Sequence, residues 1–236
     1  MAPATTIQPA TATEPAEHRF LIRNLDWERY EALLSLFEDG GPRINYLDGN
    51  VELMSPLLPH EGPKRALGFM VETVTEELGI PMDEASTTTF KRRESERGLE
   101  ADESYYLYGH VGKIRDRRRI DLDVDPPPDL AIEVEFTSSL LDKLAIYAGI
   151  CVPEIWRHDG ERLAVLWLGP DGTYSESATS RAFPLLATAE IERFLREFDP
   201  DHATPWRRRF RTWVREVLLP RHLGPQGPAG GDLHVG

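Results

Sequence analysis

The sequence contains a single cysteine, Cys151, so the chain cannot form an internal disulfide. This composition is typical of proteins in a reducing compartment, and we expect a cytoplasmic location. The N-terminal residues lack the basic start and the apolar stretch of a signal peptide. No apolar run approaches the length of a membrane span, so we expect no association with a membrane.

Positive charge is scarce, because 27 Lys and Arg residues face 40 Asp and Glu residues and the net charge is −13. This balance argues against general electrostatic attraction to nucleic acid or anionic lipid, although it leaves room for a local basic groove. A polyanionic substrate would have to be met by a few placed cations together with a metal ion.

Internal repeats are absent, and a length of 236 residues suits one domain with short tails. The apolar fraction of 40% is enough for a sizeable core. We expect residues 1–17, rich in Ala, Thr and Pro, to be a disordered tail. Residues 18–221 would form the single domain, and the Gly- and Pro-rich residues 222–236 a flexible tail.

Hydrophobic periodicity and turn residues predict a mixed α/β fold. Apolar stripes at helical spacing predict helices at 26–38, 62–78, 188–198 and 205–219. Segments of strand character lie at 44–47, 51–54, 82–92, 99–108, 154–157 and 163–168. Asp48-Gly49 is typical of a hairpin turn between the first two of these strands.

The most unusual segment follows three prolines and predicts a strand over residues 129–136. Because side chains alternate along a strand, its two faces carry Leu130, Ile132, Val134 and Phe136 on one side and Asp129, Ala131, Glu133 and Glu135 on the other. Glu133 and Glu135 then lie about 7 Å apart. Their repulsion is roughly 2 kcal/mol at an effective dielectric constant of about 20. Such a face needs either water or a neutralising cation.

A lysine follows this acidic strand closely. Ser139 and Asp142 have the spacing of a capping box and predict a helix through Tyr147, with Lys143 in its first turn. One interpretation is a divalent-metal site, in which Asp102 and Glu133 hold Mg²⁺ or Mn²⁺ and Lys143 lies opposite. The alternative is that water solvates the two glutamates on an open edge strand, and composition alone does not decide between the two.

An ordered set of motifs runs through the chain. They are VELMSP at 51–56, GLEADESYY at 98–106, PPDL at 127–130, IEVE at 132–135, TSS at 137–139, DK at 142–143, AIYA at 145–148 and VPEIWR at 152–157, with a turn at Asp159-Gly160. Each motif alone is weak. As an ordered set over roughly residues 20–200, they resemble the Uma-type restriction-endonuclease-like family of the PD-(D/E)XK nuclease superfamily, which is common in bacteria.

This resemblance implies a restriction-endonuclease-like core, a central mixed β-sheet flanked by helices, with the site on adjacent strands. It makes Asp102 the Pro-Asp carboxylate and a metal ligand, and Glu133 a second ligand. Glu135 stands where the general pattern has lysine, and Lys143 matches the family's later lysine on the following helix. Ala101 replaces the usual proline, from which we expect altered rigidity rather than lost chemistry.

Several other residues have two interpretations. Glu61 would supply an extra carboxylate or favour a helix dipole, and His60 would touch a phosphate or be solvated. The basic loop Arg115, Arg117, Arg118 and Arg119 would grip a phosphate backbone or form internal ion pairs. In the segment 206–213, the aromatic residues would stack on bases or, as their spacing favours, form the core-facing stripe of a helix.

The sequence therefore leads to a main hypothesis and two rivals. The main hypothesis is a Mg²⁺- or Mn²⁺-dependent endonuclease acting on DNA, with Asp102, Glu133, Glu135 and Lys143 as catalytic residues and Asp102 and Glu133 as metal ligands. The first rival is a catalytically weak or inactive binding or scaffold protein with the nuclease fold. The second is a hydrolase of small phosphoesters. A homodimer would suit an enzyme that cuts two strands.

Overall fold

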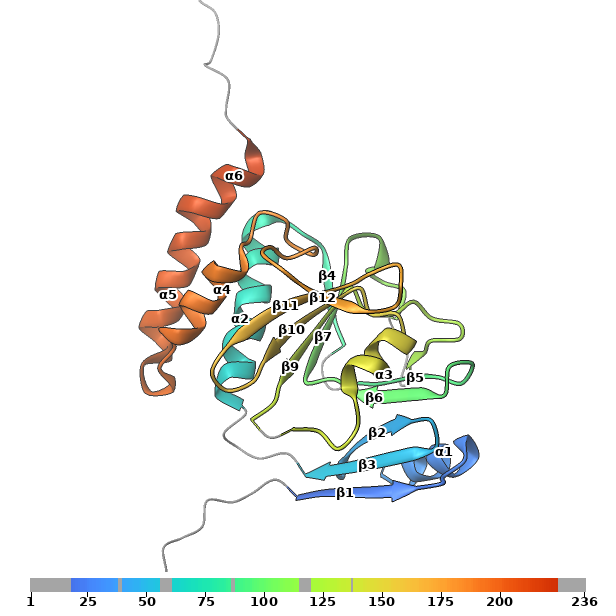
Figure 1. The fold of residues 1–236 in the computed structure, drawn as a ribbon. Coiled ribbons are helices and arrows are strands. Elements are labelled where there is room, and N and C mark those ends of the chain that lie inside the picture. The colour runs from blue at the N-terminus through green and yellow to red at the C-terminus, as the bar shows by residue number, and fades with distance from the viewer. Residues whose placement is uncertain are drawn as a thin grey trace, which may run out of the picture.

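The fold is that of a computed structural model, which describes residues 18–37, 40–55, 61–85, 88–114, 120–136 and 138–224. In these residues the strands form two six-stranded sheets (Figure 1). The N-terminal sheet has the order β1-β3-β2-β6-β5-β8, and the central sheet has the order β12-β11-β10-β9-β7-β4. The predicted mixed α/β architecture is confirmed.

The N-terminal sheet is built on a hairpin. Its strands are β1 (His18–Arg23), β2 (Arg43–Leu47), β3 (Asn50–Ser55), β5 (Thr89–Arg92), β6 (Arg97–Glu100) and β8 (Ile120–Asp121). Asp48 and Gly49 both have positive φ angles, as the predicted two-residue turn between β2 and β3 requires. Helix α1 (Trp27–Leu36) begins after Asp26, whose carboxylate accepts a hydrogen bond from the Arg29 amide. The sequence did not predict β1.

The central sheet is mixed and carries helices on both faces (Figure 1). Its strands are β4 (Met82–Glu84), β7 (Glu103–Leu107), β9 (Leu130–Val134), β10 (Glu154–His158), β11 (Leu163–Leu168) and β12 (Tyr174–Ser177). Strand β9 lies between β10, to which it is parallel, and β7, to which it is antiparallel. Because β9 is an interior strand, neither of its edges is open to solvent.

The two faces of β9 enter two different cores. Leu130, Ile132 and Val134 pack in the core beneath α2 (Glu61–Leu78), α4 (Thr188–Arg196) and α5 (Ala203–Trp213). Ala131 points the other way, into the core formed by α3 (Lys143–Gly149) and residues of both sheets. The predicted alternation is thus confirmed over 130–134. The strand ends there, and Phe136 lies beyond it with an exposed side chain.

Two segments predicted as single strands each divide between the sheets. Residues 82–92 contain β4 of the central sheet and β5 of the N-terminal sheet. Residues 99–108 contain the end of β6 and the whole of β7, and the chain crosses from one sheet to the other at Ala101 and Asp102. Local strand propensity is similar on both sides of such a crossing, so the pattern does not reveal it.

The predicted capping box before α3 is wrong. Asp142 itself is the N-cap of the helix, and its carboxylate accepts a hydrogen bond from the Ala145 amide at 3.1 Å. Ser139 instead donates to Glu52 of the N-terminal sheet. The Ser139 hydroxyl therefore binds a residue of the other sheet instead of the helix end that the local motif predicts.

The C-terminal helices cover the central sheet with an aromatic stripe. After α5 the chain continues through a π-helical segment, η4 (Val214–Leu218), and α6 (Leu219–Leu223). Trp206 and Phe210 are buried, and Trp206 stacks on Phe210 and donates its Nε1 hydrogen to the Phe194 carbonyl at 2.8 Å. The core-facing interpretation of this stripe is confirmed.

Replacing Trp206 with alanine should test that packing, because it removes a buried ring and its hydrogen bond. We expect the free energy of unfolding, measured by urea denaturation, to fall by about 3–5 kcal/mol. Arg208→Ala, at an exposed position of the same helix, is the control and should change it by less than about 0.5 kcal/mol. Equally small losses in the two variants would contradict a core role for Trp206.

Candidate active site

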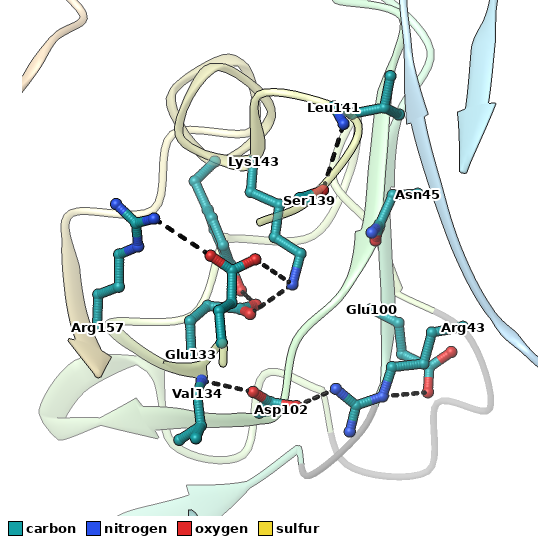
Figure 2. A network of polar contacts seen from close by, with 12 residues as sticks. Arg43, Asn45, Glu100, Asp102, Glu133, Val134, Ser139, Leu141, Lys143 and Arg157 are labelled. Carbon is teal, nitrogen blue, oxygen red and sulfur yellow. Dashed lines mark hydrogen bonds and ion pairs between the residues drawn. The ribbon is translucent and has the colours of Figure 1, made fainter. Parts of the chain in front are cut away.

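A lysine and two glutamates meet where β9 ends and α3 begins (Figure 2). The Nζ atom of Lys143 lies 2.7 Å from Oε2 of Glu133 and 3.1 Å from Oε1 of Glu135. Glu133 is 2% exposed, and Glu135 and Lys143 are each 7% exposed. The alternative in which water solvates these glutamates on an edge strand is therefore wrong, since both are buried and contact the Lys143 ammonium.

Tyr147 completes the surroundings of Glu133. Its hydroxyl donates to Oε1 of Glu133, so both oxygens of this carboxylate are held from α3. Burial raises the pKa of Glu133, Lys143 lowers it, Asp102 and Glu135 raise it, and the result is a pKa of about 7. Tyr147 was not among the site residues predicted from the sequence. Its spacing of four residues from Lys143 places both side chains on one face of the helix, and that signal could have revealed it.

Asp102 lies at the crossing between the two sheets, 3% exposed, with both carboxylate oxygens in contact with other groups. Oδ2 accepts a hydrogen bond from the Val134 amide at 2.7 Å, and Oδ1 accepts one from the guanidinium of Arg43 (Figure 2). Burial raises the pKa of Asp102, but Arg43 and Lys143 outweigh this effect and hold the pKa below its ordinary value. The bond to Val134 ties Asp102 directly to the strand that carries Glu133.

Arg43 is a second buried cation beside the site, and no sequence pattern indicated it. It begins β2 of the N-terminal sheet, and its Nε atom lies 4.0 Å from Oε1 of Glu100 in addition to the contact with Asp102. A single arginine at the start of a hairpin strand has no distinctive spacing. Only the packing of the two sheets brings it to the carboxylates.

A cavity of about 180 Å³ opens beside these residues. Glu133, Glu135 and Lys143 line it, together with Ser139, Tyr147 and Arg157. Arg157 is partly exposed, and its Nη2 atom lies 3.3 Å from Oε2 of Glu135. Glu135 thus lies between an inner cation and an outer one, at the border between the buried cluster and the cavity.

The structure brings together all four residues that the sequence predicted for the site. Asp102 is tied to the Glu133 strand, and Lys143 contacts both glutamates. In the part of the chain that the structure describes, no group of three or more His, Cys, Asp or Glu side chains is arranged to hold a metal ion. The carboxylates are instead paired with Lys143, Arg43, Arg157 and Tyr147.

The structure describes few of the other sequence candidates. His60 and the arginines at 115 and 117–119 fall outside the described residues, and Glu61 begins α2 with a side chain that is also outside them. In the basic segment before Trp213, Arg211 pairs with Glu76 and Glu77. In the described residues no helix is both long and apolar enough to cross a membrane.

Comparisons with known proteins identify the family of the chain. Residues 27–202 match the model of the family Uma2, described as "Putative restriction endonuclease". The chain is similar to a crystal structure of a putative nuclease belonging to DUF820 from Anabaena variabilis, with 13% sequence identity and a TM-score of 0.43. That similarity covers 65% of this chain and 92% of the other. None of the curated proteins matches the sequence. Since the family model spans most of the chain, the protein belongs to the Uma2 family of putative restriction endonucleases.

Proposed function

We propose that this protein is a divalent-metal-dependent endonuclease that hydrolyses phosphodiester bonds in DNA. Membership of the Uma2 family supports nuclease function in general. The observation that carries the finer proposal is the buried cluster of Asp102, Glu133, Glu135 and Lys143. A buried ion cluster adds little to stability, because desolvation offsets much of the attraction between the charges. A cluster of charged groups beside a cavity is therefore better explained by a role in catalysis or binding.

The donor set suits a hard divalent cation. Mg²⁺ and Mn²⁺ prefer carboxylate oxygens, and Asp102 and Glu133 would hold the ion. Each oxygen of Asp102 has one of the hydrogen bonds described above and can accept in a second direction. Oε1 of Glu135 forms an ion pair with Lys143 at 3.1 Å but accepts no hydrogen bond from the described residues. It can therefore still accept one.

A bound ion would supply polarisation of a phosphoryl oxygen and a water molecule of lowered pKa. Hydrolysis forms a bond between a water oxygen and phosphorus and breaks one P–O ester bond, and the departing oxygen takes up a proton. The protein side chains would stabilise the negative charge that develops on the phosphoryl oxygens, and Lys143 is suited to this role. Burial lowers the pKa of Lys143, but Glu133, Glu135 and Asp102 raise it more, so the pKa lies above its ordinary value.

Lys143 therefore stays protonated at neutral pH and stabilises negative charge on the phosphoryl oxygens rather than acting as a base. Glu135 and Tyr147 help to fix the groups around it: Glu135 contacts the ammonium directly, and Tyr147 orients Glu133. Arg157, partly exposed at the cavity, would meet the phosphate backbone. A homodimer, expected for an enzyme that cuts two strands, stays a prediction.

Asp102→Asn tests the proposed reaction, because it removes a negative charge from the site while keeping the shape of the side chain. With Mn²⁺ and supercoiled plasmid, we expect the wild type to nick DNA and the variant to lose activity by about a hundredfold or more. Chelation by EDTA should abolish the wild-type activity. Asp171→Asn, in an exposed turn, is the control. Equal and negligible nicking by wild type and Asp102→Asn, across metals and substrates, would refute the proposal and favour a binding or scaffold protein with the nuclease fold.

Glu133→Gln tests metal binding apart from catalysis. Titration calorimetry with Mn²⁺ above pH 7 should give a clear isotherm for the wild type, because Glu133, whose pKa is about 7, is then ionised and attracts the ion. The variant should bind about tenfold more weakly or not at all, since it replaces a charged ligand with a neutral one. Glu154→Gln is a matched control, because Glu154 is also buried but contacts Trp156 and Ala182. Identical isotherms for wild type and Glu133→Gln would remove Glu133 from the ligand set.

A further inference from the structure

Another buried carboxylate lies next to the cluster and has no place in the mechanism above. Glu52 of β3 is 0% exposed and accepts four hydrogen bonds. Two come from the N-terminal sheet: Nη1 of Arg19 at 2.9 Å and Nδ2 of Asn45 at 3.1 Å. Two come from the loop before α3: Oγ of Ser139 at 2.6 Å and the Leu140 amide at 2.8 Å.

These contacts divide evenly between the two carboxylate oxygens. Oε1 accepts from Arg19 and Leu140, and Oε2 accepts from Asn45 and Ser139. Each oxygen thus joins one donor of the N-terminal sheet to one donor of the loop. Because hydrogen bonds to an ionised, buried acceptor are stronger than those between neutral groups, Glu52 holds the loop firmly against the sheet.

The loop leads straight into the site. Ser139 also accepts a hydrogen bond from the Leu141 amide at 3.3 Å, Asp142 caps the helix, and Lys143 is the first residue of α3. This helix has seven residues, too few to be stable by themselves. Its position is therefore set by tertiary contacts, and the contact of the loop with Glu52 lies three residues before the Lys143 backbone.

We propose that Glu52 is a positioning residue, which fixes the start of α3 and thereby holds the Lys143 ammonium between Glu133 and Glu135. Its catalytic meaning rests on the proposed function, but its effect on Lys143 does not. The N-terminal sheet is then a working part of the site, which it supports from β3 through Glu52 and from β2 through Arg43.

The rate of lysine acetylation reports how accessible the Lys143 ammonium is, and this measurement does not depend on enzyme activity. The chain has four lysines, Lys64, Lys91, Lys113 and Lys143, so mass spectrometry can follow each one. The buried Lys143 should react slowly with N-hydroxysuccinimide acetate, while the exposed Lys113 gives the rate of a free side chain in the same sample.

Glu52→Gln is the variant to compare, because it keeps the shape but turns an NH₂ group toward two of the four donors. We expect Lys143 to react about tenfold faster than in the wild type, because the loop opens more often once charge-assisted bonds are lost. Glu154→Gln is the matched control: it disturbs another fully buried carboxylate, whose partners include Trp156 and Ala182, and should leave the Lys143 rate unchanged.

Ser139→Ala provides a milder second variant if Glu52→Gln does not fold. It removes one donor from the loop and leaves Arg19 and Asn45 on Glu52, and it should raise the Lys143 rate in the same direction. Lys143 rates that match the wild type in every folded variant of this pair would overturn the proposal. So would equal rises in Ser139→Ala and Glu154→Gln, since these would reflect general loosening.

Cleavage assays separate this inference from the proposed function. In a wild type that nicks DNA, Glu52→Gln should lower kcat about tenfold or more while KM changes little, because Lys143 is misplaced in the reaction rather than in binding. Faster acetylation of Lys143 with unchanged kcat would overturn the catalytic role of this positioning. A wild type without any activity would defeat the proposed function, and the acetylation rates would still decide whether Glu52 holds Lys143.

Discussion

The contact of the Lys143 ammonium with Glu133 and Glu135 is the interaction on which the rest of the site depends. Glu133 on the interior strand β9 and Glu135 just beyond its end repel each other and lose their hydration, so a cation beside them is needed to bury both as charged groups. Lysine supplies that cation from a helix that begins only a few residues after the strand. The short path places strand, loop and helix in one unit, in which Lys143 offsets part of the negative charge of the two glutamates.

The sequence predicted the parts of the fold that depend on neighbouring residues. Helix α1, the hairpin at Asp48-Gly49 and the alternation in β9 follow from periodicity and turn residues, and the structure confirms them. The acidic strands suggested a metal site with Asp102, Glu133 and Lys143, and the family resemblance matched these residues to its Pro-Asp carboxylate, its second ligand and its later lysine. The roles of these residues in catalysis stay predictions.

The remainder depends on contacts between distant segments, which no local pattern records. Arg43 lies 59 residues from Asp102, and Glu52 lies 87 residues from Ser139. The serine at 139 shows the problem directly, because its spacing to Asp142 satisfies a local motif while its hydroxyl is engaged by another sheet. The split of residues 99–108 between two sheets has the same origin, since strand propensity does not specify a partner strand.

The crossing at Asp102 gives the architecture a mechanical property. The backbone that leaves β6 enters β7 within two residues, and the carboxylate between them is fastened to Arg43 on one sheet and to Val134 on the other (Figures 1 and 2). Because this connection is so short, it cannot accommodate a sliding movement of one sheet against the other. Such a movement would instead strain the hydrogen bonds of this carboxylate, so a partner that binds the N-terminal sheet would act directly on the cluster around Glu133.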